Sequence, residues 1–224
     1  FLLSMTNENN AIKYKDIFKF WYPLAATWLM MSVENPYLAS FIARLPEPKY
    51  NLAAFGVAFS FALIFAAPII MIMSASTALV SNGYAFYKLR RFIYTLNSAV
   101  TVIFLIGLIP PVFYYITETL INLPHEVARL THGSLLLLLP WPAAIGYRRF
   151  YQGILIRNNL TNRVAYGTIV RLSSMSITAV ILYLFKLPGA YVGGAALSFG
   201  VTGEAIASRI MARVPVKKLK SEPI

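Results

Sequence analysis

The chain has 224 residues, of which 58% are hydrophobic and 12% are charged, and its mean hydropathy is +0.63. Soluble chains carry about 25% charged residues, so this composition excludes a water-soluble globule. The sequence contains no cysteine, which excludes disulfide scaffolds, thiol nucleophiles and cysteine-ligated metal sites.

Long stretches without Lys, Arg, Asp or Glu predict membrane-crossing helices, because about 20 mostly apolar residues cover a hydrocarbon core of about 30 Å. The clearest such stretches are Tyr50 to Tyr87 and Phe92 to Thr117. Other apolar stretches contain a proline or a single charged residue. We therefore predict an all-α integral membrane protein with six transmembrane helices, at about 17–44, 51–82, 91–118, 129–147, 164–186 and 188–210.

The distribution of basic residues predicts the orientation of these helices. The 20 Lys and Arg against 8 Asp and Glu give a formal charge of +12. All but four of the basic residues fall on the side of the N-terminus; the exceptions are Arg44, Lys49, Arg129 and Lys186. By the positive-inside rule both termini are cytoplasmic, and we expect the bacterial inner membrane. The charge is then a topology signal, and no basic face for nucleic acid is expected.

The predicted domain organisation has three parts. Residues 1–16 form a cytoplasmic N-terminal segment, 17–213 the six-helix lobe, and 214–224 a cytoplasmic tail or the start of a linker. The longest inner connection, Arg148 to Arg163, alternates aromatic and aliphatic residues with arginines. This pattern is typical of a helix that lies at the headgroup level of an anionic leaflet.

Prolines recur inside the predicted spans. A proline removes a backbone donor and disrupts the helix, so at membrane depth it marks either a simple kink or a hinge of the kind transporters use. The predicted hinge residues are Pro36, Pro68, Pro110, Pro111, Pro140 and Pro142.

Glu34 and Asn35 are the predicted ion-coupling residues. Glu34 lies about 14 residues into the first span, where a carboxylate must be protonated, paired or open to an aqueous cavity. A change in its protonation between the two sides of the membrane would provide the chemistry of a proton-coupled exporter. The alternative is a structural hydrogen bond to a neighbouring helix.

Arg171 and Glu204 are predicted to form a structural or gating ion pair. They lie at similar depth in consecutive antiparallel spans, and pairing is how charges usually persist there. The last span also carries a stripe of small residues that permits close helix contact: Gly189, Gly193, Ala196, Gly200, Gly203 and Ala207.

No enzymatic motif is evident. The sequence from His125 to Arg129 begins like the zinc-protease motif His-Glu-x-x-His, but its fifth residue is arginine. Nucleophilic triads and phosphate-binding glycine loops are also missing from the sequence, so we expect neither an enzyme nor a bound cofactor. A coupling H⁺ or Na⁺ is the only expected small ion.

The run from Tyr147 through Arg163 to Leu172, together with the opening Phe20-Trp-Tyr-Pro-Leu24, resembles the multidrug/oligosaccharidyl-lipid/polysaccharide exporter superfamily. The resemblance implies the N-terminal six-helix lobe of a MATE-like transporter, in which two lobes form a V and rock around a central cavity. It also implies that an acidic residue of the first helix, here Glu34, takes part in coupling. The second lobe would be a missing C-terminal half or a second copy of the chain.

Three functions compete on this basis. The first is a secondary-active exporter of amphipathic or cationic compounds driven by H⁺ or Na⁺. The second is a flippase for lipid-linked oligosaccharide or polysaccharide, which should use several arginines to hold a pyrophosphate. The third is a structural membrane lobe that does not transport.

Overall fold

The computed structural model describes residues 14–221, and within that range the chain is helical and contains no strand. Its elements are α1 (Tyr14–Ser32), α2 (Glu34–Ile42), α3 (Pro48–Ile70), α4 (Ile72–Leu79), α5 (Gly83–Gly107), α6 (Pro110–Tyr114), the π-helix η2 (Tyr115–Leu120), α7 (His125–Leu138), α8 (Trp141–Arg157), α9 (Thr161–Leu184), α10 (Gly189–Met211) and α11 (Arg213–Ser221).

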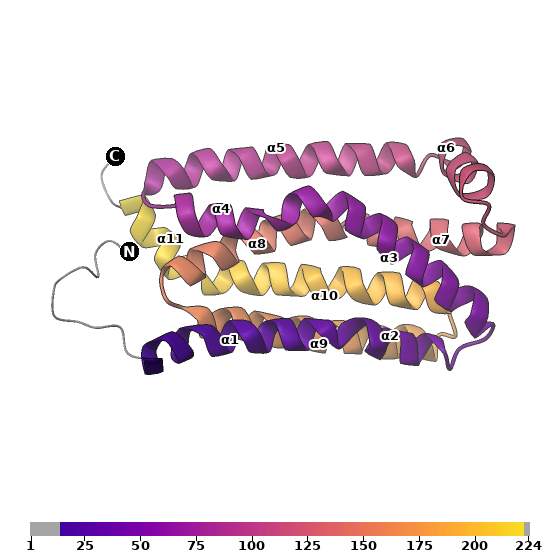
Figure 1. Ribbon diagram of the computed structural model, residues 1–224, viewed down its shortest axis with the longest axis horizontal. Helices are drawn as coiled ribbons and strands as arrows, with labels where there is room; N and C mark the ends of the chain where they lie inside the picture. Colours follow the sequence, from indigo (N-terminus) through magenta and orange to yellow (C-terminus); the bar gives the residue numbers. More distant parts are fainter. Residues whose placement is uncertain (1–13, 222–224) are drawn as a thin grey trace.

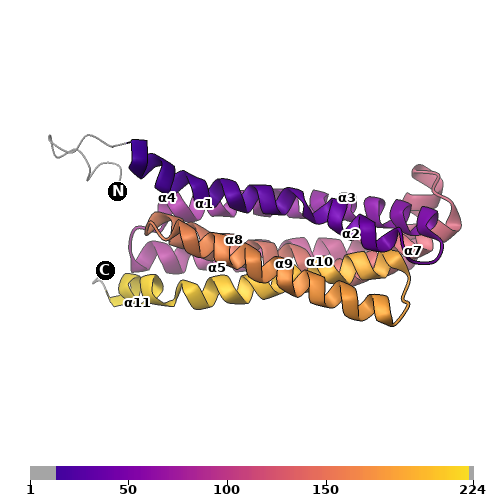
Figure 2. The same ribbon diagram turned by 90° about the horizontal axis from the view of Figure 1, so that it is seen from below.

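The helices form an elongated bundle and most of them run along its long axis (Figures 1 and 2). α1 continues into α2, α3 into α4 and α7 into α8 after short breaks, whereas α5, α9 and α10 each cover most of the length alone. The chain therefore reverses direction at the two ends of the bundle. We call the end that holds the start of α1, the α4–α5 and α8–α9 turns and α11 the basic end, on the left in Figure 1.

The elements at the two ends differ sharply in charge. The connections at the end opposite the basic end carry Arg44, Lys49, Arg129 and Lys186 together with three acidic residues. The elements at the basic end carry a much larger set of cations: Lys15, Lys19, Lys88, Arg90, Arg91, Arg157, Arg163, Arg209, Arg213, Lys217, Lys218 and Lys220.

Proline accounts for most of the helix breaks. A proline is tolerated in the first helical turn because its missing N–H would have no intrahelical partner there. Five of the predicted hinge prolines lie in or directly before such a first turn: Pro36 in α2, Pro110 and Pro111 in α6, and Pro140 and Pro142 at the start of α8. The sixth, Pro68, lies inside α3, three residues before the break at Met71.

α10 is enclosed by the other helices. It packs against α3, α7, α8 and α9, and 14 of its 23 residues are buried. Its glycines permit this enclosure: a Cβ at Gly194 would lie 2.8 Å from the carbonyl oxygen of Ser134 in α7. Within the predicted stripe, Gly200 also allows a close approach, because a Cβ there would lie 3.2 Å from the carbonyl oxygen of Arg171 in α9.

Three helical segments are long and apolar enough to cross a membrane, namely Pro48–Leu79, Gly83–Gly107 and Thr161–Leu184. The predicted spans 17–44, 129–147 and 188–210 lie on helices outside this set. α1 begins with Lys15, Asp16 and Lys19, α7 and α8 are only 14 and 17 residues long, and α10 is rich in glycine and carries Glu204. The coarser prediction of an all-helical chain is confirmed for the described residues, and the three apolar segments indicate association with a membrane.

Two predicted elements need correction. The predicted span 91–118 corresponds to α5, which begins at Gly83 and ends at Gly107, because Asn82 caps its start and Pro110 and Pro111 follow its end. Residues 148–157 were expected in a connection at the headgroup level. They instead complete α8, and all of them except Arg157 are buried.

Candidate functional site

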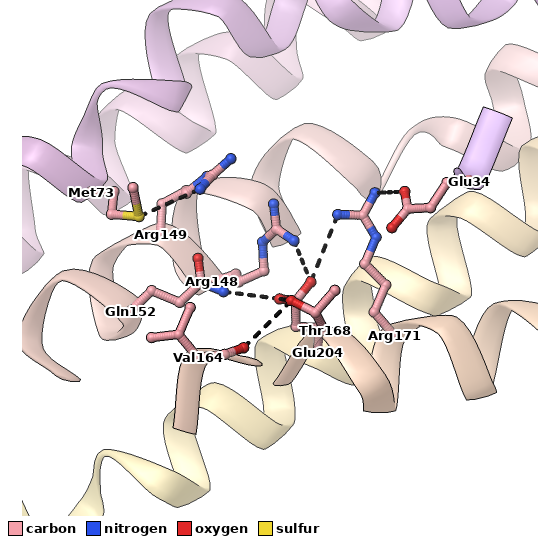
Figure 3. Close-up of polar contacts among 9 residues, drawn as sticks. All are labelled: Glu34, Met73, Arg148, Arg149, Gln152, Val164, Thr168, Arg171 and Glu204. Carbon is pink, nitrogen blue, oxygen red and sulfur yellow. Dashed lines mark hydrogen bonds and ion pairs between the residues drawn. The ribbon is translucent and has the colours of Figure 1, made fainter. Parts of the chain in front are cut away.

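The candidate site is a chain of buried charged side chains between α2, α8, α9 and α10 (Figure 3). Glu34 is the first residue of α2, at the break that separates α2 from α1, and it is only 4% exposed. The adjacent Asn35 is exposed, and no hydrogen bond of its side chain occurs among residues 14–221. The structure thus brings Glu34, but not Asn35, into the cluster.

Arg171 of α9 connects the two buried carboxylates. Its Nη2 donates to Oε2 of Glu34, and its Nη1 lies 3.8 Å from Oε2 of Glu204. Arg171 therefore has two carboxylate partners. The predicted one, Glu204, is the more distant, and the nearer one, Glu34, lies 137 positions earlier in the chain.

Glu204 of α10 is fully buried and has several partners. Its Oε2 accepts a hydrogen bond from Nη1 of Arg148, and its Oε1 accepts one from Nε2 of Gln152 at 2.9 Å. The hydroxyl of Thr168 in α9 is 3.4 Å from the same Oε1. The carboxylate therefore joins α8, α9 and α10 in the interior of the bundle.

Arg149 is the third buried arginine, at 6% exposure, and it points away from the Glu204 cluster (Figure 3). Its Nη1 lies 3.4 Å from the sulfur of Met73 in α4, and its guanidinium carbon lies 5.6 Å from the ring centre of Trp28 in α1. It forms no ion pair with any described carboxylate.

Alternation of charge explains how these groups persist in the interior. Glu34, Arg171, Glu204 and Arg148 follow one another with opposite signs, and a buried charge is tolerated only when it is paired and hydrogen-bonded. Pairing is nonetheless incomplete, because Oε1 of Glu34 has no hydrogen-bond partner among the described residues. When Arg149 is included, the interior holds three buried arginines and two buried carboxylates, so one positive charge is in excess.

The cluster can respond to a small cation. A proton or Na⁺ on Glu34 would neutralise the carboxylate and weaken its attraction for Arg171. Arg171 would then retain Glu204 as its only nearby carboxylate in the described chain. Within residues 14–221, no three histidine or acidic side chains gather as they would for a dedicated metal centre.

Arg148, Arg149 and Gln152 were missed as site residues, since all three were placed in the inner connection. One available signal was the composition of this segment: Phe150, Tyr151 and the run Ile154 to Ile156 are large apolar residues of the kinds that are usually buried. A second signal was Gly153, where a Cβ would lie 2.7 Å from the carbonyl oxygen of Met73.

The charged cluster lies inside an all-helical bundle. Comparisons with protein-family models, curated proteins and solved structures find no match to this chain. A functional assignment must therefore be argued from the geometry.

Proposed function

We propose that this chain is one lobe of an alternating-access membrane transporter with six membrane-crossing passes. The lengthwise course of α1–α2, α3–α4, α5, α7–α8, α9 and α10 supports this proposal, although three of these passes fall outside the set that length and composition identify. Of these three passes, α8 and α10 can be less apolar because neighbouring helices cover them. The charge difference between the two ends supports cytoplasmic termini at the basic end.

The contact between Glu34 and Arg171 is the observation that carries the proposed mechanism. α1 packs mainly on α9, and only two residues of α1 are buried. The ion pair connects the break between α1 and α2 to α9. The break lies where Pro36 prevents a continuous helix. Binding of H⁺ or Na⁺ at Glu34 would release this tie and allow α1 and α2 to move relative to α9, which couples ion binding to the exposure of a cavity.

The first candidate cargo is an amphipathic or cationic compound exported by such ion coupling, as the resemblance to MATE-like transporters implies. The second candidate is a lipid-linked saccharide, and one observation favours it. Arg148, Arg149 and Arg171 are all buried, and Arg149 has no carboxylate partner among the described residues. A buried arginine without a carboxylate partner would attract a phosphate or pyrophosphate group and repel a cationic compound.

Transport by the purified chain in proteoliposomes tests the proposal. Glu34→Gln removes the charge with little change in shape, so we expect the rate of ion-coupled transport to fall by about tenfold or more, which corresponds to an activation barrier higher by at least about 1.4 kcal/mol. The matched control is Glu126→Gln, which removes the charge of an exposed carboxylate paired with Arg129, and it should transport like the parent.

Two results would contradict the mechanism. If Glu34→Gln transports at the parental rate with the same ion dependence, Glu34 has no part in coupling. If no ion gradient drives uptake of either a cationic dye or a labelled lipid-linked sugar, the chain is a structural lobe. A comparison of these two substrates separates the exporter from the flippase, and cross-linking of the reconstituted protein shows whether two copies assemble.

A further inference from the structure

A second feature of the molecule is a cavity at the basic end, whose lining shares no residue with the charged cluster. Its volume is about 320 Å³, and it lies between α5, α8, α10 and α11. The residues that line it are Phe86, Arg90, Tyr151, Arg209, Arg213, Val216, Lys217 and Lys220. Five of these eight side chains are cationic and none of them is acidic.

The cations of this cavity have aromatic neighbours but no carboxylate partner among the described residues. The guanidinium carbon of Arg90 lies 5.4 Å from the ring centre of Phe86 and 5.1 Å from that of Tyr87. Nζ of Lys220 lies 5.7 Å and 5.5 Å from the same two ring centres. Two like charges from α5 and α11 thus share one pair of rings, and nothing in the described chain neutralises them.

Arg209 adds a third cation from α10. Its guanidinium donates to the hydroxyl of Tyr147 and faces that ring at 5.9 Å, so its position is fixed by α8. Arg213 and Lys217 follow at four-residue spacing along α10 and α11, which places them on the same side as Arg209. Three helices therefore direct cations to one small volume, as in sites that hold a phosphate group.

The surroundings of the cavity resemble a membrane–water boundary. Exposed apolar side chains continue along the helix beside the cations, at Ile206, Ile210 and Val214. Exposed tyrosines occur near the start of α5, at Tyr84, Tyr87 and Tyr94. Tyrosine is enriched at the headgroup level of membranes, so phosphate chemistry and hydrocarbon are both available at this place.

We propose that this cavity binds a phosphate-bearing anion, and that an anionic phospholipid of the adjoining leaflet supplies the phosphate. The five cations hold the headgroup, and Ile206, Ile210 and Val214 lie where the acyl chains leave it. A bound lipid neutralises the shared charge of Arg90 and Lys220 and so fastens α11 to α5. The proposal does not depend on the transport mechanism, because no lining residue forms a hydrogen bond or ion pair with Glu34 or Glu204 in the described chain.

Binding of fluorescent phosphatidylglycerol to the full chain in a non-ionic detergent tests the proposal. The double variant Arg213→Gln/Lys217→Gln removes two cavity cations, and we expect affinity to fall by about tenfold or more. The control Arg91→Gln/Lys218→Gln removes two exposed cations from the same helices, outside the cavity, and should bind like the parent. Arg213→Lys/Lys217→Arg keeps the charge and should restore most of the binding.

Competition distinguishes the two sources of phosphate. If phosphatidylglycerol displaces the probe and inorganic pyrophosphate does not, the site takes a lipid. If pyrophosphate competes equally well, and the cavity variant weakens the binding of both ligands, the cavity is a phosphate site but the assignment of a lipid as its ligand is overturned. Equal binding by the cavity and control variants, with unchanged circular dichroism, would overturn the site itself and leave only a diffuse charge effect.

Discussion

α5 and α10 are of similar length, yet they occupy opposite environments. α10 has 23 residues, of which 14 are buried, whereas α5 has 25 residues, of which only six are buried. By length and composition α5 is long and apolar enough to cross a membrane, whereas α10 is not in that set. For this pair of helices, hydropathy detects the exposed one and misses the one that its neighbours cover.

The buried polar residues of the two helices also differ between the enclosed α10 and the exposed α5. α10 carries the charged Glu204, whose oxygens are hydrogen-bonded by residues of α8 and α9. α5 carries the neutral Asn97, whose Nδ2 donates to the carbonyl oxygen of Ala143 at 3.1 Å. Of these two helices, only the enclosed one holds a carboxylate, and several side chains of its neighbours donate hydrogen bonds to it.

The largest expected effect comes from removing this carboxylate. Glu204→Ala leaves Arg148 buried without its nearest counter-charge, so we expect the free energy of unfolding to fall by about 3–5 kcal/mol. Asn97→Ala removes one interhelical hydrogen bond from α5 and should cost only about 0.6–1.7 kcal/mol. Denaturant unfolding in micelles measures both values, and equal losses would show that α10 is no more enclosed than α5.

Glycine substitutions give the next largest difference. Gly194→Ala in α10 forces a Cβ against the backbone of α7 at Ser134, and such overpacking costs about 1–3 kcal/mol. Gly107→Ala in α5 places its Cβ 3.7 Å from the ring of Phe65, an ordinary contact, and should leave stability unchanged or slightly raised. Thermal unfolding in detergent compares the two. A harmless Gly194→Ala would contradict the close contact of α7 and α10.

The smallest perturbation is a single cysteine, which the cysteine-free sequence makes specific. Ile103 of α5 is 57% exposed and Val201 of α10 is fully buried. We expect Ile103→Cys in native membranes to react with a membrane-soluble maleimide, and Val201→Cys to react only after denaturation. Equal labelling of the two in the native state would mean that α10 also faces lipid.

Part of this architecture could be predicted from the sequence. The uncharged stretch that begins at Tyr50 and the basic residues around Lys88 and Lys217 indicated a membrane-associated helical chain with one basic side, because hydropathy and charge are local properties. The break at Pro36 was also visible, since proline acts on its own backbone.

The composition of the candidate site was less predictable. Glu34, Arg171 and Glu204 were singled out because a lone charge in an apolar stretch needs a partner. Arg148 was not, because it follows Tyr147 in a segment where several arginines suggested a surface. Which of those arginines turns inward depends on α8 lying beside Glu204, a contact between residues 56 positions apart.

The sequence alone determined that this chain is helical, apolar and more basic at one side, because each of these properties belongs to individual residues and their immediate neighbours. The tertiary structure alone decided which helix is enclosed, which carboxylate Arg171 reaches first, and which cations gather around the cavity at the basic end. Those outcomes depend on the packing of distant helices. Burial, which makes a charge costly unless it is paired, is a property of the assembled bundle.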